Sequence, residues 1–214
     1  IRFRPFLIKE EKVLLLAMEA QDGKMILQSI IDTIDACVEQ DIRFSQLPLF
    51  DIEYLFLQIR SKSVGETSDV KIKCKKCEES NDITVNLDDI KIAVPKKTKT
   101  IELDDTYTLE MKYPSVKDVI SSGILTEDIP LSEITFKSIG MCIDAVLSEE
   151  ERISLSDESP EEIDNFVNSL NTKQFNDIKK FVDTIPQLKH KVEFACTSCE
   201  EHNTVNLQGT DDFF

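Results

Sequence analysis

Four of the six cysteines in this sequence form two C-x-x-C pairs, Cys74 with Cys77 and Cys196 with Cys199. In a reducing compartment, cysteines at this spacing are typical of metal sites rather than of disulfides. Zinc is held by four thiolates in a tetrahedron, with each sulfur about 2.3 Å from the metal. The two pairs together predict one four-cysteine zinc site. Its closed shell leaves no position for water or substrate, so the zinc would be structural. The motif does not distinguish zinc from iron.

Each cysteine pair lies in a repeated stretch, KIKCKKCEESNDITVNL from Lys71 and KVEFACTSCEEHNTVNL from Lys191. Apolar and polar residues alternate on both sides of the cysteines, which predicts a β-hairpin with the cysteines at its turn. When the two stretches are aligned, the part that follows the cysteines is longer by two residues in the first stretch, and one alignment assigns them to Ile83 and Thr84. Side chains in a strand alternate between the two faces of a sheet with a period of two residues, so a two-residue difference leaves each later side chain on the same face. Each hairpin is expected to supply half of a zinc-ribbon-like site.

Two other interpretations of the cysteine pairs stay open. A redox pair is disfavoured because neither C-x-x-C opens a predicted helix and because glutamates that follow each pair oppose thiolate formation. The two histidines of the chain, His190 and His202, lie near the second pair and are alternative ligands, although four cysteines already fill the shell. The remaining cysteines, Cys37 and Cys142, are expected to pack in the core as small hydrophobic residues.

The first third of the chain is predicted to hold a strand and two helices. The compact apolar run at 12–18 is interpreted as a buried strand. Apolar residues recur at helical spacing over 24–40, and a second helix is expected over 51–65. This second helix is apolar on nearly all sides. Tyr54 and Leu57, on its outer face, are therefore candidate contacts for a partner.

Further along, strict alternation at 107–113 predicts a half-buried strand. From 114 to 186 the apolar spacing becomes helical. Ser159, followed by Pro160 and by Glu162, has the pattern of a capping box at a helix start. One long helix is expected to carry an apolar stripe made of Phe136, Ile139, Ile143, Val146 and Leu147.

These elements predict an α+β fold with an all-helical insertion between the two cysteine hairpins. Four segments are expected. They are an N-terminal strand and helices (1–65), a first cysteine hairpin and strand (66–113), the helical insertion (114–188), and a second cysteine hairpin with the C-terminal tail (189–214).

Composition narrows the function. The 214 residues carry a net charge of −16, which disfavours binding to phosphate backbones. No apolar run approaches the roughly 20 residues that span a bilayer, and the charged start is not a signal peptide, so an intracellular protein without membrane or nucleic-acid partners is expected. The five glycines are not clustered, and no phosphate loop, G-x-S-x-G or H-E-x-x-H motif is present. We therefore expect no enzyme and no small-molecule substrate.

Several segments together resemble the T4-type bacteriophage baseplate hub protein family. They are FRPFLIKEEKVLLLAMEA, LPLFDIEYLFLQIRSKSVGE, the first cysteine block, MKYPSVKDV, SIGMCIDAVL and the ending KHKVEFACTSC…NLQGTDDFF. The resemblance implies a viral protein that works in the host cytoplasm during assembly of the central hub of a contractile tail. Its partners would be other hub or tail proteins. Members act as hub subunits or as hub-assembly factors of chaperone type, and the sequence does not say whether this chain stays in the virion baseplate.

A zinc-ribbon module that binds nucleic acid or assists transcription is the alternative function. The negative charge and the lack of a basic or aromatic strip on the ribbon strands disfavour it. The ending TDDFF places two aromatic side chains, Phe213 and Phe214, at the C-terminus. They are expected either to pack back on the body of the protein or to insert into a partner.

Overall fold

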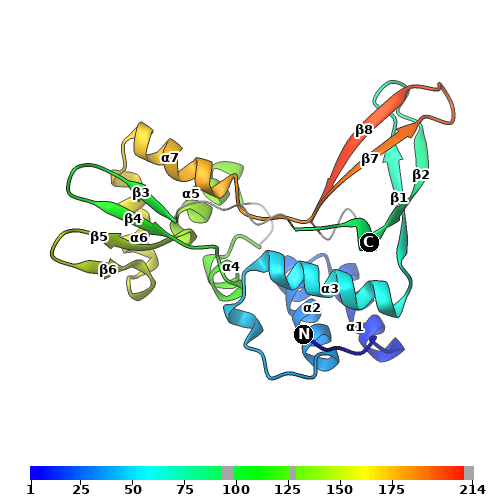
Figure 1. Ribbon diagram of the computed structural model, residues 1–214, viewed down its shortest axis with the longest axis horizontal. Helices are drawn as coiled ribbons and strands as arrows, with labels where there is room; N and C mark the ends of the chain where they lie inside the picture. The colour runs from blue at the N-terminus through cyan, green and yellow to red at the C-terminus, as the bar shows by residue number, and fades with distance from the viewer. Residues whose placement is uncertain (93–98, 126–128, 210–214) are drawn as a thin grey trace.

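The computed structural model describes residues 1–92, 99–125 and 129–209, which form three parts around separate apolar clusters (Figure 1). The helical lobe contains α1 (Ile8–Ala20), α2 (Gly23–Cys37), α3 (Leu49–Ser63) and α4 (Val116–Ser122). The sheet lobe contains β3 (Thr100–Glu102), β4 (Thr108–Met111), β5 (Ile143–Leu147), β6 (Arg152–Ser154), α5 (Leu131–Met141), α6 (Pro160–Ser169) and α7 (Thr172–Val182). The paired hairpins are β1 (Thr67–Lys73) with β2 (Ser80–Asn86) and β7 (Lys189–Ala195) with β8 (His202–Gln208). Helices and antiparallel sheets are both present, which confirms the α+β class.

In the helical lobe, α2 follows the sequence pattern closely. Asp22 caps the helix because its carboxylate accepts hydrogen bonds from the backbone N–H groups of Lys24 and Met25 at 2.9 and 3.0 Å. The apolar stripe of α2 faces α3, and Ile34 and Ile52 are fully buried between them. The helices predicted over 24–40 and 51–65 are thus confirmed, with starts one or two residues earlier than expected.

The strand predicted at 12–18 is wrong, because these residues lie in the middle of α1. The run VLLLAM contains one β-branched residue, and Leu, Ala and Met are strong helix formers. A compact apolar run does not by itself separate a buried strand from a helix segment. The helix buries only Glu10 and Ala17, so most of its apolar side chains remain on the surface.

Helix α3 lies between the other helices of the helical lobe and the paired hairpins, which explains why it is apolar on nearly all sides (Figure 1). Ile52 and Ile59 face the helical lobe. Leu57, expected on the outer face, is fully buried against the hairpins instead. It is therefore not available as a surface contact. Tyr54 remains 37% exposed.

The segment expected to be all-helical contains two strands. These strands belong to one antiparallel sheet in the order β3-β4-β5-β6. Strand β4, which precedes the segment expected to be all-helical, therefore pairs with β5, which lies within that segment. The stripe expected on one helix is broken at Cys142, where α5 ends and β5 begins. Beyond it, Ile143 and Ala145 alternate inward as in a strand, whereas the spacing of Ile143, Val146 and Leu147 also fits a helix. The strand expected at 107–113 is confirmed by β4, which buries Leu109 and Met111.

Helices α5, α6 and α7 cover the sheet. Ser159 caps α6 as predicted: its Oγ accepts from the Glu162 N–H at 3.3 Å, and the Glu162 carboxylate accepts from the Ser159 N–H at 2.8 Å. At Gly140 a Cβ atom would lie 2.9 Å from the Ile163 Cγ2 atom, so glycine lets α5 and α6 approach closely. Ile139, Val167 and Ile178 fill the space beneath the sheet.

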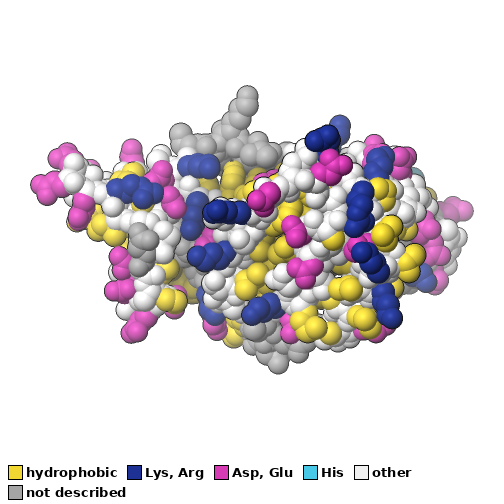
Figure 2. Space-filling view, turned by 90° about the horizontal axis from the view of Figure 1, so that it is seen from below, with side chains coloured by type: hydrophobic (Ala, Val, Ile, Leu, Met, Phe, Trp, Pro, Cys, Tyr) yellow, Lys and Arg dark blue, Asp and Glu magenta, His cyan; other side chains and the backbone are white. Residues whose placement is uncertain are grey.

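The surface is charged, with apolar areas between the charges. On the face that Figure 2 shows, acidic and basic side chains are interspersed with several hydrophobic patches. Among the described residues, no helix combines the length and hydropathy needed to cross a bilayer.

Glu10 fixes the chain before α1. Its carboxylate accepts hydrogen bonds from the Arg4 guanidinium at 3.0 Å and from the Leu7 N–H at 2.6 Å. Burial alone would raise the pKa of Glu10, but these bonds and the charges of Arg4 and Lys9 outweigh it and lower the pKa from 4.5 to about 2. The carboxylate therefore contributes stability above pH 4.5 that is lost as the pH falls towards 2.

We expect Glu10→Gln to destabilise the protein near neutral pH and to flatten the loss of stability between pH 4.5 and 2. Chemical unfolding at a series of pH values measures this. Asp35→Asn, at an exposed position of α2, is the control. Equal pH profiles for the wild type and Glu10→Gln would contradict the assigned role.

Candidate metal centre

The two hairpins that carry the cysteines are equal in length. All four strands have seven residues, and the pairing of Thr67 with Asn86 and of Lys73 with Ser80 is matched by Lys189 with Gln208 and Ala195 with His202. The two-residue difference inferred from the sequence alignment is therefore wrong. Ile83 corresponds to Val205 and Val85 to Leu207, with the same alternation of burial. The alignment was misled because the apolar residues recur every two positions.

The cysteine turn has the same backbone in both hairpins. In the first, the Cys74 N–H donates to the Glu79 carbonyl at 2.8 Å, and the Glu78 N–H donates to the Cys74 carbonyl at 3.0 Å. The second turn repeats both bonds, at 2.9 and 3.0 Å, around Cys196. Glu78 and Glu200 adopt the left-handed conformation, with φ of 60° and 59°. This turn brings the two sulfurs of each C-x-x-C pair to the same side of the hairpin.

The four sulfurs meet between the hairpins. The Sγ atoms of Cys74 and Cys199 are 3.7 Å apart, those of Cys77 and Cys196 are 3.6 Å apart, and all four lie within 4.8 Å of one another. Four sulfurs at about 2.3 Å from a central metal form a tetrahedron with edges of about 3.8 Å. The two distances between sulfurs of different hairpins match this edge, and all four sulfurs are close enough together to bind one metal ion. Cys74 and Cys196 are buried, whereas Cys77 is exposed.

Backbone N–H groups favour the thiolate form of the two buried cysteines. The N–H groups of Cys77 and Lys76, followed by the Asn203 amide, lower the pKa of Cys74 to about 6 although burial opposes them. The N–H groups of Ser198 and Cys199 act in the same way and lower the pKa of Cys196. Ionised sulfur is the form that binds metal.

The sulfurs do not ionise independently. The Glu79 N–H lowers the pKa of Cys77, but the hydrogen bond with Cys199, burial, and the bonds with Cys196 and Cys74 outweigh it and raise the pKa to about 12. Several negative charges this close repel one another. A divalent cation at the centre reverses this repulsion and makes all four thiolates stable. The donor set therefore fits a bound metal ion.

Two asparagines join each hairpin to the other. Asn81 donates from Nδ2 towards the Sγ atom of Cys196 at 3.7 Å and accepts from the Thr197 N–H at 2.9 Å. Asn203 mirrors it, donating to the Cys74 Sγ atom at 3.4 Å and accepting from the Lys75 N–H at 2.9 Å. Both side chains are 2% exposed. These contacts hold the sulfurs and align the two turns across the site.

The role of the asparagines was not predicted from the sequence. Both occupied matching positions in the repeat, but they were treated only as part of the strands. The available signal was a polar residue retained at an inward-facing position of both hairpins. A buried amide requires hydrogen-bond partners, and here both hairpins supply them: Nδ2 of Asn81 and of Asn203 also donates to a carbonyl of its own turn at 2.9 Å, while the oxygen accepts from the opposite turn.

Lysines in the first turn offset the negative charge of the site. Lys76 forms an ion pair with Glu201 of the second hairpin at 3.0 Å, and Lys75 donates from Nζ to the Thr204 carbonyl at 2.6 Å. The bond with Glu201 and the charges of Glu201 and of the thiols raise the pKa of Lys76. Both lysines therefore add contacts between the hairpins.

The other candidate ligands lie outside the cluster. Within the described ranges, the group that could hold a metal consists of the four cysteines alone, without His190 or His202. Cys37 and Cys142 are buried in the helical and sheet lobes, as expected. Phe213 and Phe214 lie outside the described residues, so their expected partner contact stays a prediction.

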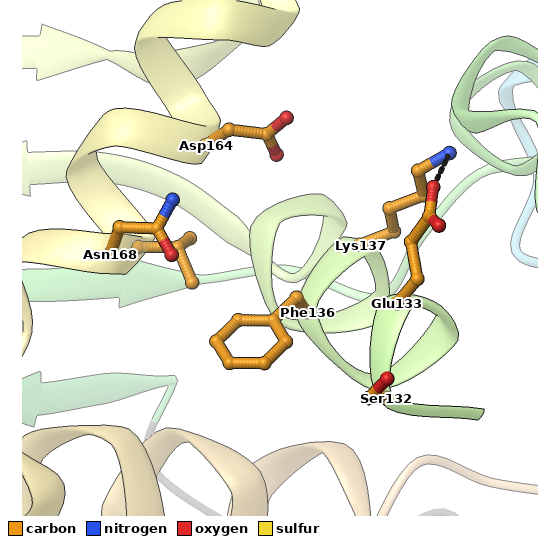
Figure 3. Close-up of a pocket in the computed structure, with 7 residues that line it drawn as sticks. Ser132, Glu133, Phe136, Lys137, Asp164 and Asn168 are labelled. Carbon is orange, nitrogen blue, oxygen red and sulfur yellow. Dashed lines mark ion pairs between the residues drawn. The ribbon is translucent and has the colours of Figure 1, made fainter. Parts of the chain in front are cut away.

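Two hollows on the described surface could accommodate a small molecule, and the side chains that line them show whether catalytic groups are present. One of about 430 Å³ lies where α3, α4, α5 and α7 meet and is lined mainly by apolar side chains, with Glu53 at its edge. The other, of about 370 Å³, lies between α5 and α6, where Asp164 and Asn168 extend from α6 into the space beside α5, which carries Phe136 (Figure 3). Glu133 in this hollow is paired with Lys137 at 3.0 Å. Neither lining contains a histidine or a Ser–His arrangement.

Comparison of the sequence with models of known protein families gives a match. The model of the family described as T4 bacteriophage base plate protein matches residues 1–214. Searches among curated proteins and among solved structures gave no significant match.

We expect Asn81→Ala and Asn203→Ala each to destabilise the paired hairpins by about 1–3 kcal/mol, because each change leaves buried groups of the opposite turn without partners. Asn206→Ala, at an exposed position of β8, is the control. Thermal unfolding and the rate of metal transfer to a coloured chelator measure the effect. Wild-type values for both asparagine variants would show that the amides do not hold the site.

Proposed function

The chain belongs to the T4 bacteriophage base plate protein family, and we propose that it acts in assembly of the central baseplate hub by binding other hub proteins. In this proposal the chain is a non-enzymatic subunit or assembly factor. It binds its partners in the cytoplasm of the infected bacterium. The family match over the whole chain supports a role in the phage tail, and the resemblance of several segments to hub proteins supports the narrower assignment.

The observation that carries the structural part of the proposal is the meeting of four cysteines from two distant hairpins. We assign zinc to this site as a structural ion. Cys74, Cys77, Cys196 and Cys199 hold the ion, while Asn81 and Asn203 orient the sulfurs. A zinc ion with four thiolates has no open position, so the site fastens the hairpins and performs no chemistry on a substrate.

Cys74→Ser and Cys196→Ser are each expected to lower bound zinc from one ion per chain to near zero and to unfold the paired hairpins. The reason is that structural zinc contributes about 10–16 kcal/mol of binding free energy in small zinc domains. Elemental analysis by mass spectrometry and thermal unfolding provide the measurements. Cys37→Ala, in the helical lobe, is the control that should keep the metal.

Iron in place of zinc would show in the same elemental analysis and in visible absorption. If the wild-type protein is stably folded in thermal unfolding and contains no bound metal, the metal assignment is refuted. That result would leave the assignment to the family intact, because the family match does not depend on the metal.

Hub binding is tested with the C-terminal tail. Deleting Phe213 and Phe214 is expected to reduce recovery of purified hub proteins in a pull-down, because the deletion removes two aromatic side chains that suit a partner pocket. Melting temperature and zinc content should not change. Tyr54→Ser, at the partly exposed position of α3, is a second variant in the same experiment. Equal recovery with all variants would exclude both candidate contacts.

A further inference from the structure

The first helix is the least covered part of the molecule. Of the fourteen large hydrophobic residues that are exposed within the described ranges, eight lie in the first 25 residues. They are Ile1, Leu7, Ile8, Val13, Leu15, Leu16, Met18 and Met25. A helix that is apolar on all sides is normally buried. Helix α1 carries apolar side chains on its outward side as well as on its covered side, yet only Glu10 and Ala17 of the helix are buried.

The outward side of α1 has a definite pattern. Ile8 and Leu15 are spaced by seven residues and are 78% and 55% exposed, and Leu16 beside them is 55% exposed. Lys12 and Glu19 have the same seven-residue spacing on this side and are exposed. Residues spaced by seven lie on one face of a helix. Leu15 and Leu16 therefore lie at the centre of this face, with Lys12 on one side of them and Glu19 on the other.

Charge also distinguishes this region from the rest of the chain. Residues 1–25 contain five basic and four acidic residues, whereas the whole chain has a net charge of −16. The basic ones are Arg2, Arg4, Lys9, Lys12 and Lys24, and the acidic ones are Glu10, Glu11, Glu19 and Asp22. Two copies of the chain repel each other over most of their surface, but much less at this near-neutral region.

We propose that the outward face of α1 binds α1 of a second copy of this chain, with the two helices antiparallel about a two-fold axis between Leu15 and Leu16. A two-fold interface uses the same patch on both copies, so the patch must complement itself. In this register Leu15 lies opposite Leu16 of the second copy, and Lys12 lies opposite Glu19 of the second copy. The second Lys–Glu pair forms by symmetry.

The positions of the two charges favour this occupant. Lys12 and Glu19 are equally distant from the axis, so pairing in one copy requires pairing in the other. No described residue of the same chain is close enough to form an ion pair with either. A helix that lies on a lipid surface carries a strongly basic polar face, whereas exposed α1 residues include both Lys9 and Glu19. The helix face is short, so the dimer is expected to be weak and dependent on concentration.

Charge reversal tests the register directly. In sedimentation velocity over a range of protein concentrations, the wild type is expected to convert from monomer to dimer. Lys12→Glu and Glu19→Lys each place like charges opposite one another twice, and each should weaken the dimer by about tenfold or more. An equimolar mixture of the two variants should dimerise again, because every contact then joins a Lys to a Glu. The double variant Lys12→Glu with Glu19→Lys should also regain the dimer.

Three controls complete the experiment. Leu15→Ser with Leu16→Ser should abolish the dimer without lowering the melting temperature, since both side chains are exposed in the monomer. Lys117→Glu, on the exposed side of α4, should leave the dimer unchanged. Ile153→Ser, at an exposed position of the edge strand β6, should also have no effect.

A monomer at every concentration would overturn the proposal. So would a dimer that Lys12→Glu leaves intact, or single variants that fail to dimerise when mixed. If this face instead bound a different purified hub protein or lipid vesicles and the protein did not self-associate, the assignment of a second copy as the binding partner would be wrong. The experiment does not depend on the metal or on hub binding.

Discussion

The paired hairpins depend on closing a very long segment of chain. Cys77 and Cys196, whose sulfurs are 3.6 Å apart, are separated by 119 positions in the sequence. Closing a flexible loop of that length costs about 4 kcal/mol in chain entropy. The proposed zinc, at about 10–16 kcal/mol in small zinc domains, exceeds this cost. Folding of the intervening sheet lobe reduces the cost further, because a folded segment fixes much of the distance between its ends.

Apolar packing supports the same closure from the other side of the hairpins. An isolated two-stranded hairpin is marginal in water, and each of these hairpins has only its own pair of strands. Leu57 of α3 and Leu188, just before β7, are fully buried against the hairpin side chains. The four cysteines lie at the turns of the hairpins, whereas this apolar cluster lies at their opposite ends. The hairpins are therefore attached to the helical lobe by burial and to each other by the sulfurs.

Much of this arrangement follows from local sequence signals, and the errors have two physical causes. The capping residue Ser159 and the C-x-x-C turns act within a few residues, so they could be predicted from the sequence. The interpretations of 12–18 and 143–147 were wrong because short apolar runs fit both helix and strand spacing. Leu57 was placed on the surface because the element that covers it, a hairpin pair, includes a strand pair more than a hundred residues away. The sequence alone does not specify such distant packing.

The sequence repeat is explained by reciprocal hydrogen bonds between the two hairpins. Each turn supplies two sulfurs, but the amide that donates to a buried sulfur comes from the other hairpin, Asn203 to Cys74 and Asn81 to Cys196. A single hairpin would leave its buried asparagine without the partner turn and its two sulfurs without the other half of a tetrahedron. Two hairpins of equal length solve both problems at once, because each satisfies the polar groups of the other. This reciprocity requires matching lengths from the cysteines to the asparagines, which is why that part of the repeat has no insertion.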